Sequence, residues 1–108
     1  MFVSGEIIRG TTPKHEFLLP FDEKTIKELR VTYGQNKQII LRKTQDEVEF
    51  GDNLISIRLT QEETLLFTAR SLVTVEIKTL LNNGEVISSY DEPILLRVVD
   101  CLNEEVLQ

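Results

Sequence analysis

Apolar and polar residues alternate along most of this chain, which is the pattern of strands with one buried and one solvated face. Four stretches show it clearly, and each is bounded by polar or turn-forming residues. Their predicted inward-facing positions are Ile55, Ile57 and Leu59; Val73, Val75 and Ile77; Leu29, Val31 and Tyr33; and Ile94, Leu96 and Val98. The pattern therefore predicts an antiparallel sheet structure packed on one side.

Further strands are predicted at residues 2–8, 16–19, 38–42, 48–50 and 85–90. The apolar run within 38–42 leaves open whether that strand is covered on one face or on both. The strand at 2–8 could offer an edge to a neighbouring chain. We favour the simpler interpretation, in which it packs inside its own domain.

Short turns separate these strands. Asn83-Gly84 lies between two of them, and Asn-Gly predicts a two-residue hairpin because both positions tolerate positive φ. Residues 34–37 predict a second hairpin loop and residues 51–53 a third turn. Pro93 is expected at the start of the last strand, where a missing N–H does least harm.

Two short helical turns are also predicted. Thr60 and Glu63 form a capping-box pattern, and residues 65–67 are expected to supply the buried side of about two helical turns. Asp22 can cap a second turn at residues 23–27, with Ile26 turned inward.

These elements predict an all-β fold: an immunoglobulin-like antiparallel β-sandwich of about 7 to 9 short strands with one or two short helical turns. The chain has 108 residues, and we expect residues 1–108 to form a single domain. Residues 103–108 are expected to fray or to dock on a neighbour. A sequence without two cysteines and a tryptophan has no antibody-type disulfide pin.

Charge narrows the range of partners. The net charge is −6, and the basic residues are scattered among acids along the sequence: Arg9, Lys14, Lys27, Arg42, Arg58, Arg70, Lys78 and Arg97. A nucleic-acid-binding protein usually concentrates basic residues on one surface. We therefore expect no nucleic acid and no anionic membrane as partner, and an acidic surface that could meet a basic protein.

Cys101 is the only cysteine, which fits a reducing compartment, and we expect it to behave as a small hydrophobic residue. The first residues do not form a secretory signal peptide, and no apolar stretch approaches the roughly 20 residues that span a bilayer. The sequence thus predicts a protein made in the cytoplasm and not exported by the ordinary route.

No catalytic, cofactor-binding or metal-binding residues are predicted, and no small-molecule substrate. His15 is the only histidine, and we expect it to be a half-exposed strand residue. The acids at residues 46–52 could ligate calcium, but a solvated turn explains them as well. Tyr33, Phe50 and Tyr90 are the candidates for a sugar platform, and each is expected in the core or at its rim. The sequence predicts a protein that is not an enzyme.

Three stretches carry a resemblance to a known group of proteins. They are residues 8–13 with 17–22 (IRGTTP and FLLPFD), residues 29–33 running to 40–43 (LRVTY and ILRK), and residues 55–67 (ISIRLTQEETLLF). They resemble small uncharacterised phage and prophage proteins of Gram-positive bacteria. The layout is also similar to the immunoglobulin-like N-terminal domain of the upper baseplate protein of tailed phages.

The resemblance implies a structural or adaptor component of a bacteriophage or prophage particle: a tail, baseplate, neck or head-decoration part. It implies other phage structural proteins as partners, a homo-oligomer, and a location in the host cytoplasm on synthesis and then in the virion. No functional residues are carried over by it. Two alternatives stay open: a carbohydrate-binding or host-recognition module, and a small acidic protein inhibitor of a host enzyme.

Overall fold

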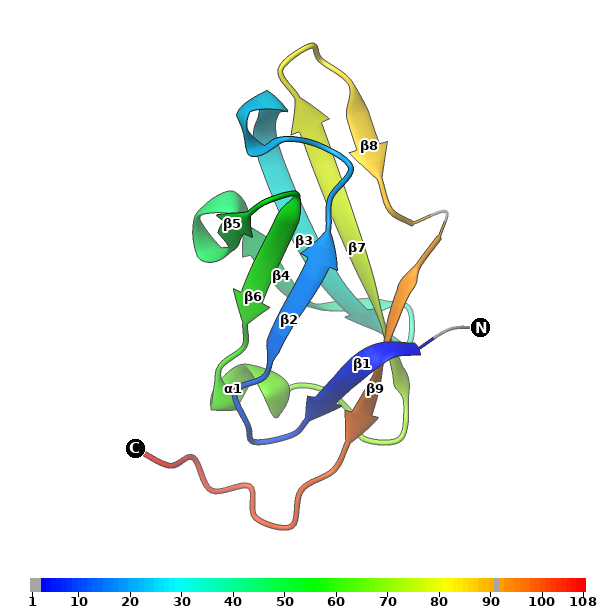
Figure 1. Ribbon diagram of the computed structural model, residues 1–108. Coiled ribbons are helices and arrows are strands. Elements are labelled where there is room, and N and C mark those ends of the chain that lie inside the picture. The colour runs from blue at the N-terminus through cyan, green and yellow to red at the C-terminus, as the bar shows by residue number, and fades with distance from the viewer. Residues whose placement is uncertain (1–2, 91) are drawn as a thin grey trace.

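The computed structural model describes residues 3–90 and 92–108 (Figure 1). This part of the chain contains nine strands and three short helical segments. The strands are β1 (Val3–Ile8), β2 (Lys14–Leu18), β3 (Ile26–Gln35), β4 (Gln38–Thr44), β5 (Glu49–Gly51), β6 (Leu54–Arg58), β7 (Leu72–Leu81), β8 (Val86–Ser88) and β9 (Ile94–Val99). The helical segments are η1 (Glu23–Thr25), η2 (Gln45–Glu47) and α1 (Gln61–Thr64).

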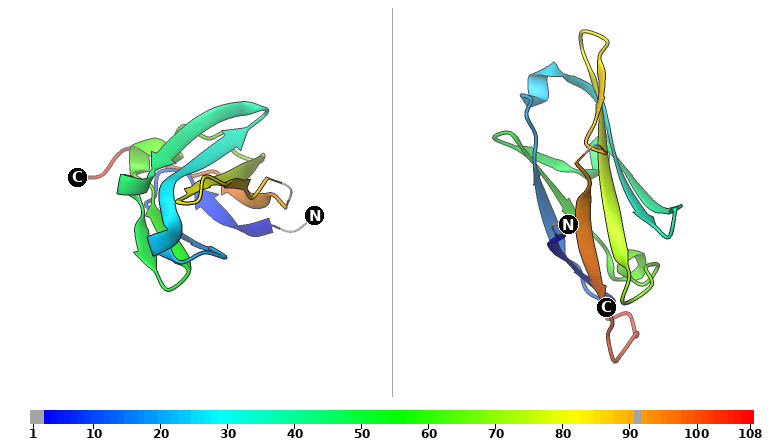
Figure 2. Two further views of the ribbon diagram at one scale, coloured as in Figure 1. Left: turned by 90° about the horizontal axis from the view of Figure 1, so that it is seen from above. Right: turned by 90° about the vertical axis from the view of Figure 1, so that its right-hand side faces the viewer.

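The strands form two facing sheets, which Figure 2 shows edge-on in its right-hand view. The larger sheet has the order β1-β9-β7-β3-β4, with β8 paired to the far end of β7, and the smaller has the order β2-β6-β5. Every described pairing is antiparallel except β1 with β9, which is parallel. The parallel edge pair is a departure from the all-antiparallel sandwich expected from the sequence.

This strand order confirms the immunoglobulin-like sandwich. In the alphabetical naming of immunoglobulin strands, β2, β6 and β5 take the places of B, E and D, and β9, β7, β3 and β4 take those of G, F, C and C′. β4, at the edge of the larger sheet beside β3, is in the place of C′, the strand added in variable-type domains. β8 and β9 together form the last strand, which is interrupted between Ser88 and Ile94.

The predicted alternation is confirmed in the core. The inward positions of β3, β6 and β7 are buried, and Leu96 and Val98 of β9 are buried as well. Ile94 is only half-buried, whereas Leu95, predicted to face out, is 8% exposed. Ile7 is fully buried, so β1 packs inside its own domain; Phe2 of the predicted strand lies outside the described residues.

An aromatic cluster takes the place of a disulfide pin between the sheets. Tyr33, on the strand in the place of C, is fully buried, and its ring centroid is 6.1 Å from those of both His15 and Phe67. Phe17 extends the cluster from β2. The prediction that His15 is half-exposed is wrong: it is 8% exposed, because it lies on the inner face of β2.

The predicted turns at residues 34–37, 51–53 and 83–84 are present, but the loop at Asn83-Gly84 is longer than predicted. A two-residue turn lies at Asn36-Lys37, where both residues have positive φ, 54° and 65°. At the predicted Asn-Gly hairpin, Leu81 N–H donates to Glu85 O, so the loop has an additional residue, Asn82. There the glycine at position 84 alone provides the positive φ, 94°.

Both predicted caps form. Glu63 N–H donates to Thr60 Oγ1 (3.1 Å) and Thr60 N–H donates to Glu63 Oε1 (2.9 Å), which completes the capping box of α1. Lys24 N–H donates to Asp22 Oδ1, and η1 is shorter than the predicted turn. The buried side expected at residues 65–67 is wrong in part: α1 ends at Thr64, and Leu66 is 58% exposed while Phe67 is buried.

The described C-terminal residues after β9 contain no helix or strand, and they run below α1 (Figure 1). Two hydrogen bonds tie them down near the end, since the Gln61 side chain donates to Leu107 O (2.8 Å) and accepts from Leu107 N–H (2.9 Å). No helix within the described part of the chain is long and apolar enough to cross a membrane.

Candidate interaction surface

The outer face of the larger sheet is hollowed into a groove of about 720 Å³ across β3, β4 and β7. We call it the outer groove; its lining includes Arg30, Lys37, Ile39, Arg42, Leu72, Glu76, Lys78 and Tyr90. None of these side chains belongs to the hydrophobic core. The groove therefore presents side chains that the fold does not use for its own interior.

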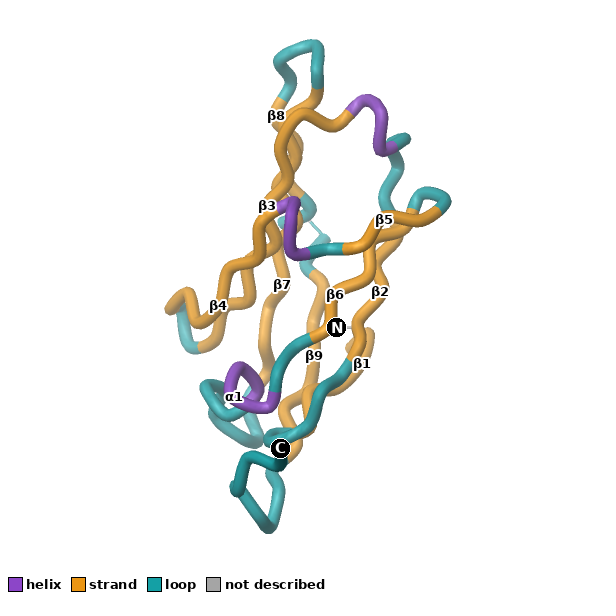
Figure 3. Tube along the Cα trace, turned by 90° about the vertical axis from the view of Figure 1, so that its left-hand side faces the viewer, coloured by secondary structure: helices purple, strands orange, loops and turns teal. Residues whose placement is uncertain are grey.

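A bend in the β3–β4 hairpin makes this face concave. The hairpin turns away from the smaller sheet, as Figure 2 (right) and Figure 3 show from opposite sides. The pairing register shifts between Tyr33 and Gly34, so that Tyr33 pairs with Leu41 but Gly34 pairs with Ile39. The extra residue, Ile40, makes a β-bulge, which bends the strand and increases its twist.

β4 lies at the open edge of the larger sheet. The sequence left open whether this strand is covered on one face or on both. Ile39 is 58% exposed, and Ile40 and Leu41 are half-buried. The strand is not covered on both faces. Lys43, which points inward from this edge, is buried and ion-paired with Glu63 at 2.6 Å. An inward-pointing charge of this kind discourages another strand from adding to the edge.

Within residues 3–90 and 92–108, four cationic side chains and one acidic side chain line the outer groove, in a chain whose net charge is −6. Arg30 and Lys78 are direct cross-strand partners, an arrangement that is unfavourable for two like charges. Arg42 faces the same side one pair further along, opposite Thr32. Among the described residues, no carboxylate forms an ion pair with Lys37, Arg42 or Lys78.

The one acid of the groove is occupied by a hydrogen bond. Ser88 Oγ donates to Glu76 Oε2 at 2.5 Å, and Tyr90 N–H donates to the same Ser88 oxygen at 3.1 Å. These contacts set the backbone of Tyr90, whose side chain is 63% exposed, beside the groove. Leu72 and Ile39 add exposed apolar surface. The groove thus combines positive charge with apolar contact area.

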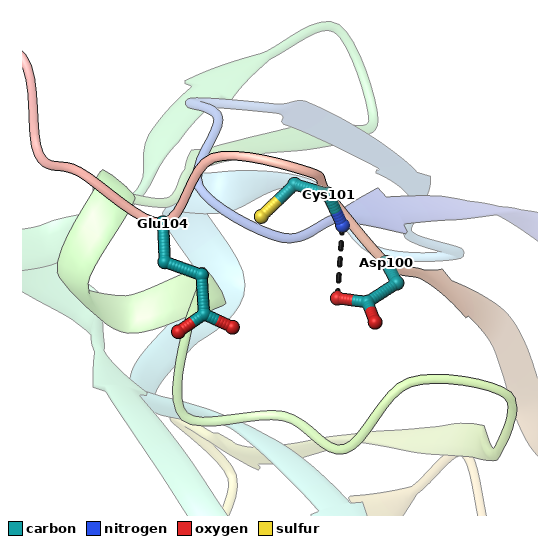
Figure 4. Close-up of side chains that lie close together, drawn as sticks. All are labelled: Asp100, Cys101 and Glu104. Atoms are coloured by element: carbon teal, nitrogen blue, oxygen red, sulfur yellow. Dashed lines mark hydrogen bonds between the residues drawn. The ribbon is translucent and has the colours of Figure 1, made fainter.

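A second cluster of polar side chains lies where the C-terminal residues meet Arg9. Ligand atoms of Asp100, Cys101 and Glu104 come within 4.8 Å of one another (Figure 4). Arg9 Nη1 contacts Asp100 Oδ1 and Glu104 Oε2, both at 2.7 Å. The hydrogen bond from Arg9, followed by that from Cys101 N–H, holds the pKa of Asp100 below the usual value, and hydrogen bonds to Glu104 and Asp100 raise the pKa of Arg9. An arginine already supplies the positive charge here, so the cluster is an anchor for the C-terminal residues.

The other candidates from the sequence do not come together. Within residues 46–52, Glu47 accepts from Thr44 N–H and completes a capping box at η2, and this contact lowers its pKa. Tyr33 is in the core, Phe50 is half-buried and Tyr90 is exposed, so these three rings form no shared platform. Cys101 is half-buried.

His15 is held in its neutral form by the core. Its Nε2 lies 3.1 Å from Glu6 O, a pure acceptor, so Nε2 carries the proton and Nδ1 accepts from Tyr33 Oη at 3.2 Å. Burial lowers the pKa of His15, and the contact with Glu6 O opposes this shift more weakly. The histidine is therefore part of the packing between the sheets.

We expect the stability of the protein to fall as the pH drops below about 6.5, the pKa of an unfolded histidine. The folded pKa lies below the unfolded one, so the unfolded chain binds the proton first, and stability present above pH 6.5 is lost as the pH falls toward the folded pKa. Urea unfolding between pH 5 and 8 measures this slope. In His15→Gln the slope between pH 5 and 7 should flatten; an unchanged slope would contradict the assignment.

No protein-family model matches this chain. No curated protein matches it either. Among solved structures, it is similar to the V domain of amphioxus IgVJ-C2, with 9% sequence identity over 92% of this chain and 100% of that chain, and a TM-score of 0.38. The fold assignment rests on the strand order described above, and a similarity of this size transfers no function.

Proposed function

We propose that this chain is a non-enzymatic binding module that acts through protein–protein contacts made by the outer groove. The observation that supports this proposal is the gathering of Arg30, Arg42 and Lys78 on one concave face. Among the described residues Arg42 and Lys78 have no ion-paired carboxylate, and Arg30 has only a 4.0 Å contact with Glu28. Because such side chains add nothing to the hydrophobic core, a binding role accounts for them better than a structural one.

The sequence resemblance supplies the biological setting. Under this proposal the chain is a structural or adaptor component of a bacteriophage or prophage particle, made in the host cytoplasm and then incorporated in the virion. Its partners are other phage structural proteins, and it forms a homo-oligomer. The turns and caps that carry the resemblance hold the sandwich together, as the capping box of Thr60 and Glu63 illustrates.

Photo-cross-linking in assembled particles tests the proposal. A photoreactive amino acid replaces Thr32, whose side chain faces the outer groove, and the matched control replaces Ser56 on the outer face of the smaller sheet. Virions from induced prophage are purified, irradiated and analysed by mass spectrometry. We expect the chain in the virion and a cross-link from position 32 to another virion protein or another copy. Absence from the virion, or equal cross-linking from both positions, would reject the proposal.

A further inference from the structure

We infer that the outer groove binds an extended acidic segment of a partner protein. This inference rests on the proposed function and specifies the chemistry of the partner. The groove lies in a chain of net charge −6, yet those of its lining residues that the structure describes carry four positive charges against one negative charge. Complementary charge is what steers and orients a protein partner on such a surface.

The cross-strand pair of Arg30 and Lys78 gives the first argument. Two like charges directly opposite each other destabilise a sheet, and an anion placed between them removes that repulsion. Arg30 Nη1 donates to Leu29 O at 3.0 Å, and its ion pair is a 4.0 Å contact with Glu28. A carboxylate supplied by a partner would therefore gain more here than at a cation that is already paired.

A second like-charge pair shows why the groove matters. Lys14 and Arg58 are cross-strand partners on the outer face of the smaller sheet, but neither lines the outer groove. Arg58 also donates from Nη1 to Thr12 O at 2.8 Å. This pair has the same like-charge arrangement outside the outer groove, so it serves as the matched control.

The spacing of the groove fits an extended chain. Successive outward positions on a strand are two residues apart, about 6.8 Å, and the alternate side chains of an extended peptide have the same spacing. Thr32 lies one such step from Arg30 along β3, and its partner Arg42 lies one strand over on β4. Acidic side chains at alternate positions of a bound segment point to the same side and can reach both cations, and Leu72, Ile39 and Tyr90 add exposed apolar surface beside them.

Fluorescence anisotropy with a labelled peptide of alternating glutamate and valine tests the inference on the full chain. The matched probe carries glutamine in place of glutamate. We expect the glutamate peptide to bind, with an affinity that falls as salt rises. Arg42→Glu and Lys78→Glu should each weaken binding by about tenfold or more, since each removes a charged hydrogen-bonding group and adds a repulsion. Lys14→Glu changes the net charge equally and should change the affinity by less than about twofold.

Three results would overturn the inference: equal binding of the glutamine peptide, equal weakening by Lys14→Glu, or no binding of the glutamate peptide at low salt. Heparin and single-stranded DNA serve as further probes. If either binds more tightly and with the same dependence on Arg42 and Lys78, the partner is a polyanion of another class. Circular dichroism melting of each variant shows that lost binding does not come from unfolding.

The two proposals can fail separately. If position 32 cross-links in virions to a segment without acidic residues, the proposed function stands and the acidic partner is rejected. If the chain is absent from virions but the glutamate peptide binds in the groove, the binding chemistry stands and the virion role is rejected.

Discussion

Replacing Phe67 with alanine should lower the free energy of unfolding by about 4 kcal/mol, the range measured when a large aromatic side chain is removed from a core. Phe67 is 1% exposed, and its ring packs at 58° against Tyr33, with centroids 6.1 Å apart. It follows α1 in the sequence and belongs to the hydrophobic core between the sheets. Equilibrium unfolding in urea measures the change.

Its neighbour provides the control. Leu66 precedes Phe67 in sequence and is 58% exposed, so Leu66→Ala should change the stability by less than about 0.5 kcal/mol. The two residues look equivalent in the sequence, and only their exposure in the fold separates them. Similar losses from both substitutions, or a loss below about 1 kcal/mol for Phe67→Ala, would contradict the packing described for this segment.

Replacing Glu63 with glutamine should cost about 3 kcal/mol of stability, because it leaves a buried ammonium group without its counter-charge. Glu63 Oε2 accepts from Lys43 Nζ at 2.6 Å, and the Lys43 side chain is 9% exposed. Glutamine can still accept from Thr60 N–H, so the cap of α1 is retained and the lost charge dominates. The remaining acid, Glu47, is 3.9 Å from Lys43 Nζ and offsets only part of the loss.

Removing the other partner of the ion pair, Lys43, should lower the stability less. In Lys43→Met an unbranched apolar side chain fills the buried space, and Glu63 keeps its cap and contact with water, so we expect a loss of under about 1.5 kcal/mol. Glu62, which is exposed and directly precedes Glu63, gives the control: Glu62→Gln should leave the free energy of unfolding almost unchanged. Urea unfolding of both single variants and the double variant completes a double-mutant cycle, and equal costs for Glu63→Gln and Lys43→Met would contradict this asymmetry.

Most of the local structure follows from short-range patterns in the amino-acid sequence. Alternation located Ile55, Ile57, Val73 and Val75 in the core, because a strand with one buried face must repeat every two residues. The caps at Asp22 and Thr60 are equally predictable from the sequence, because a cap depends on residues within three positions of each other. The hairpin at residues 81–85 was located, but its loop length was wrong, because strand register decides which residues close the turn.

The outer groove, in contrast, depends on how distant strands pair. Arg30 and Lys78 are far apart in the sequence and become partners because β7 lies beside β3 in the sheet, with β4 on the other side of β3. No local pattern carries that information, so the basic residues looked scattered until the strands were ordered. The burial of His15 and the exposure of Leu66 were decided in the same way, by which face of each element meets the opposite sheet. Local propensity specifies the elements, and the order in which distant strands pair determines which side chains are brought together.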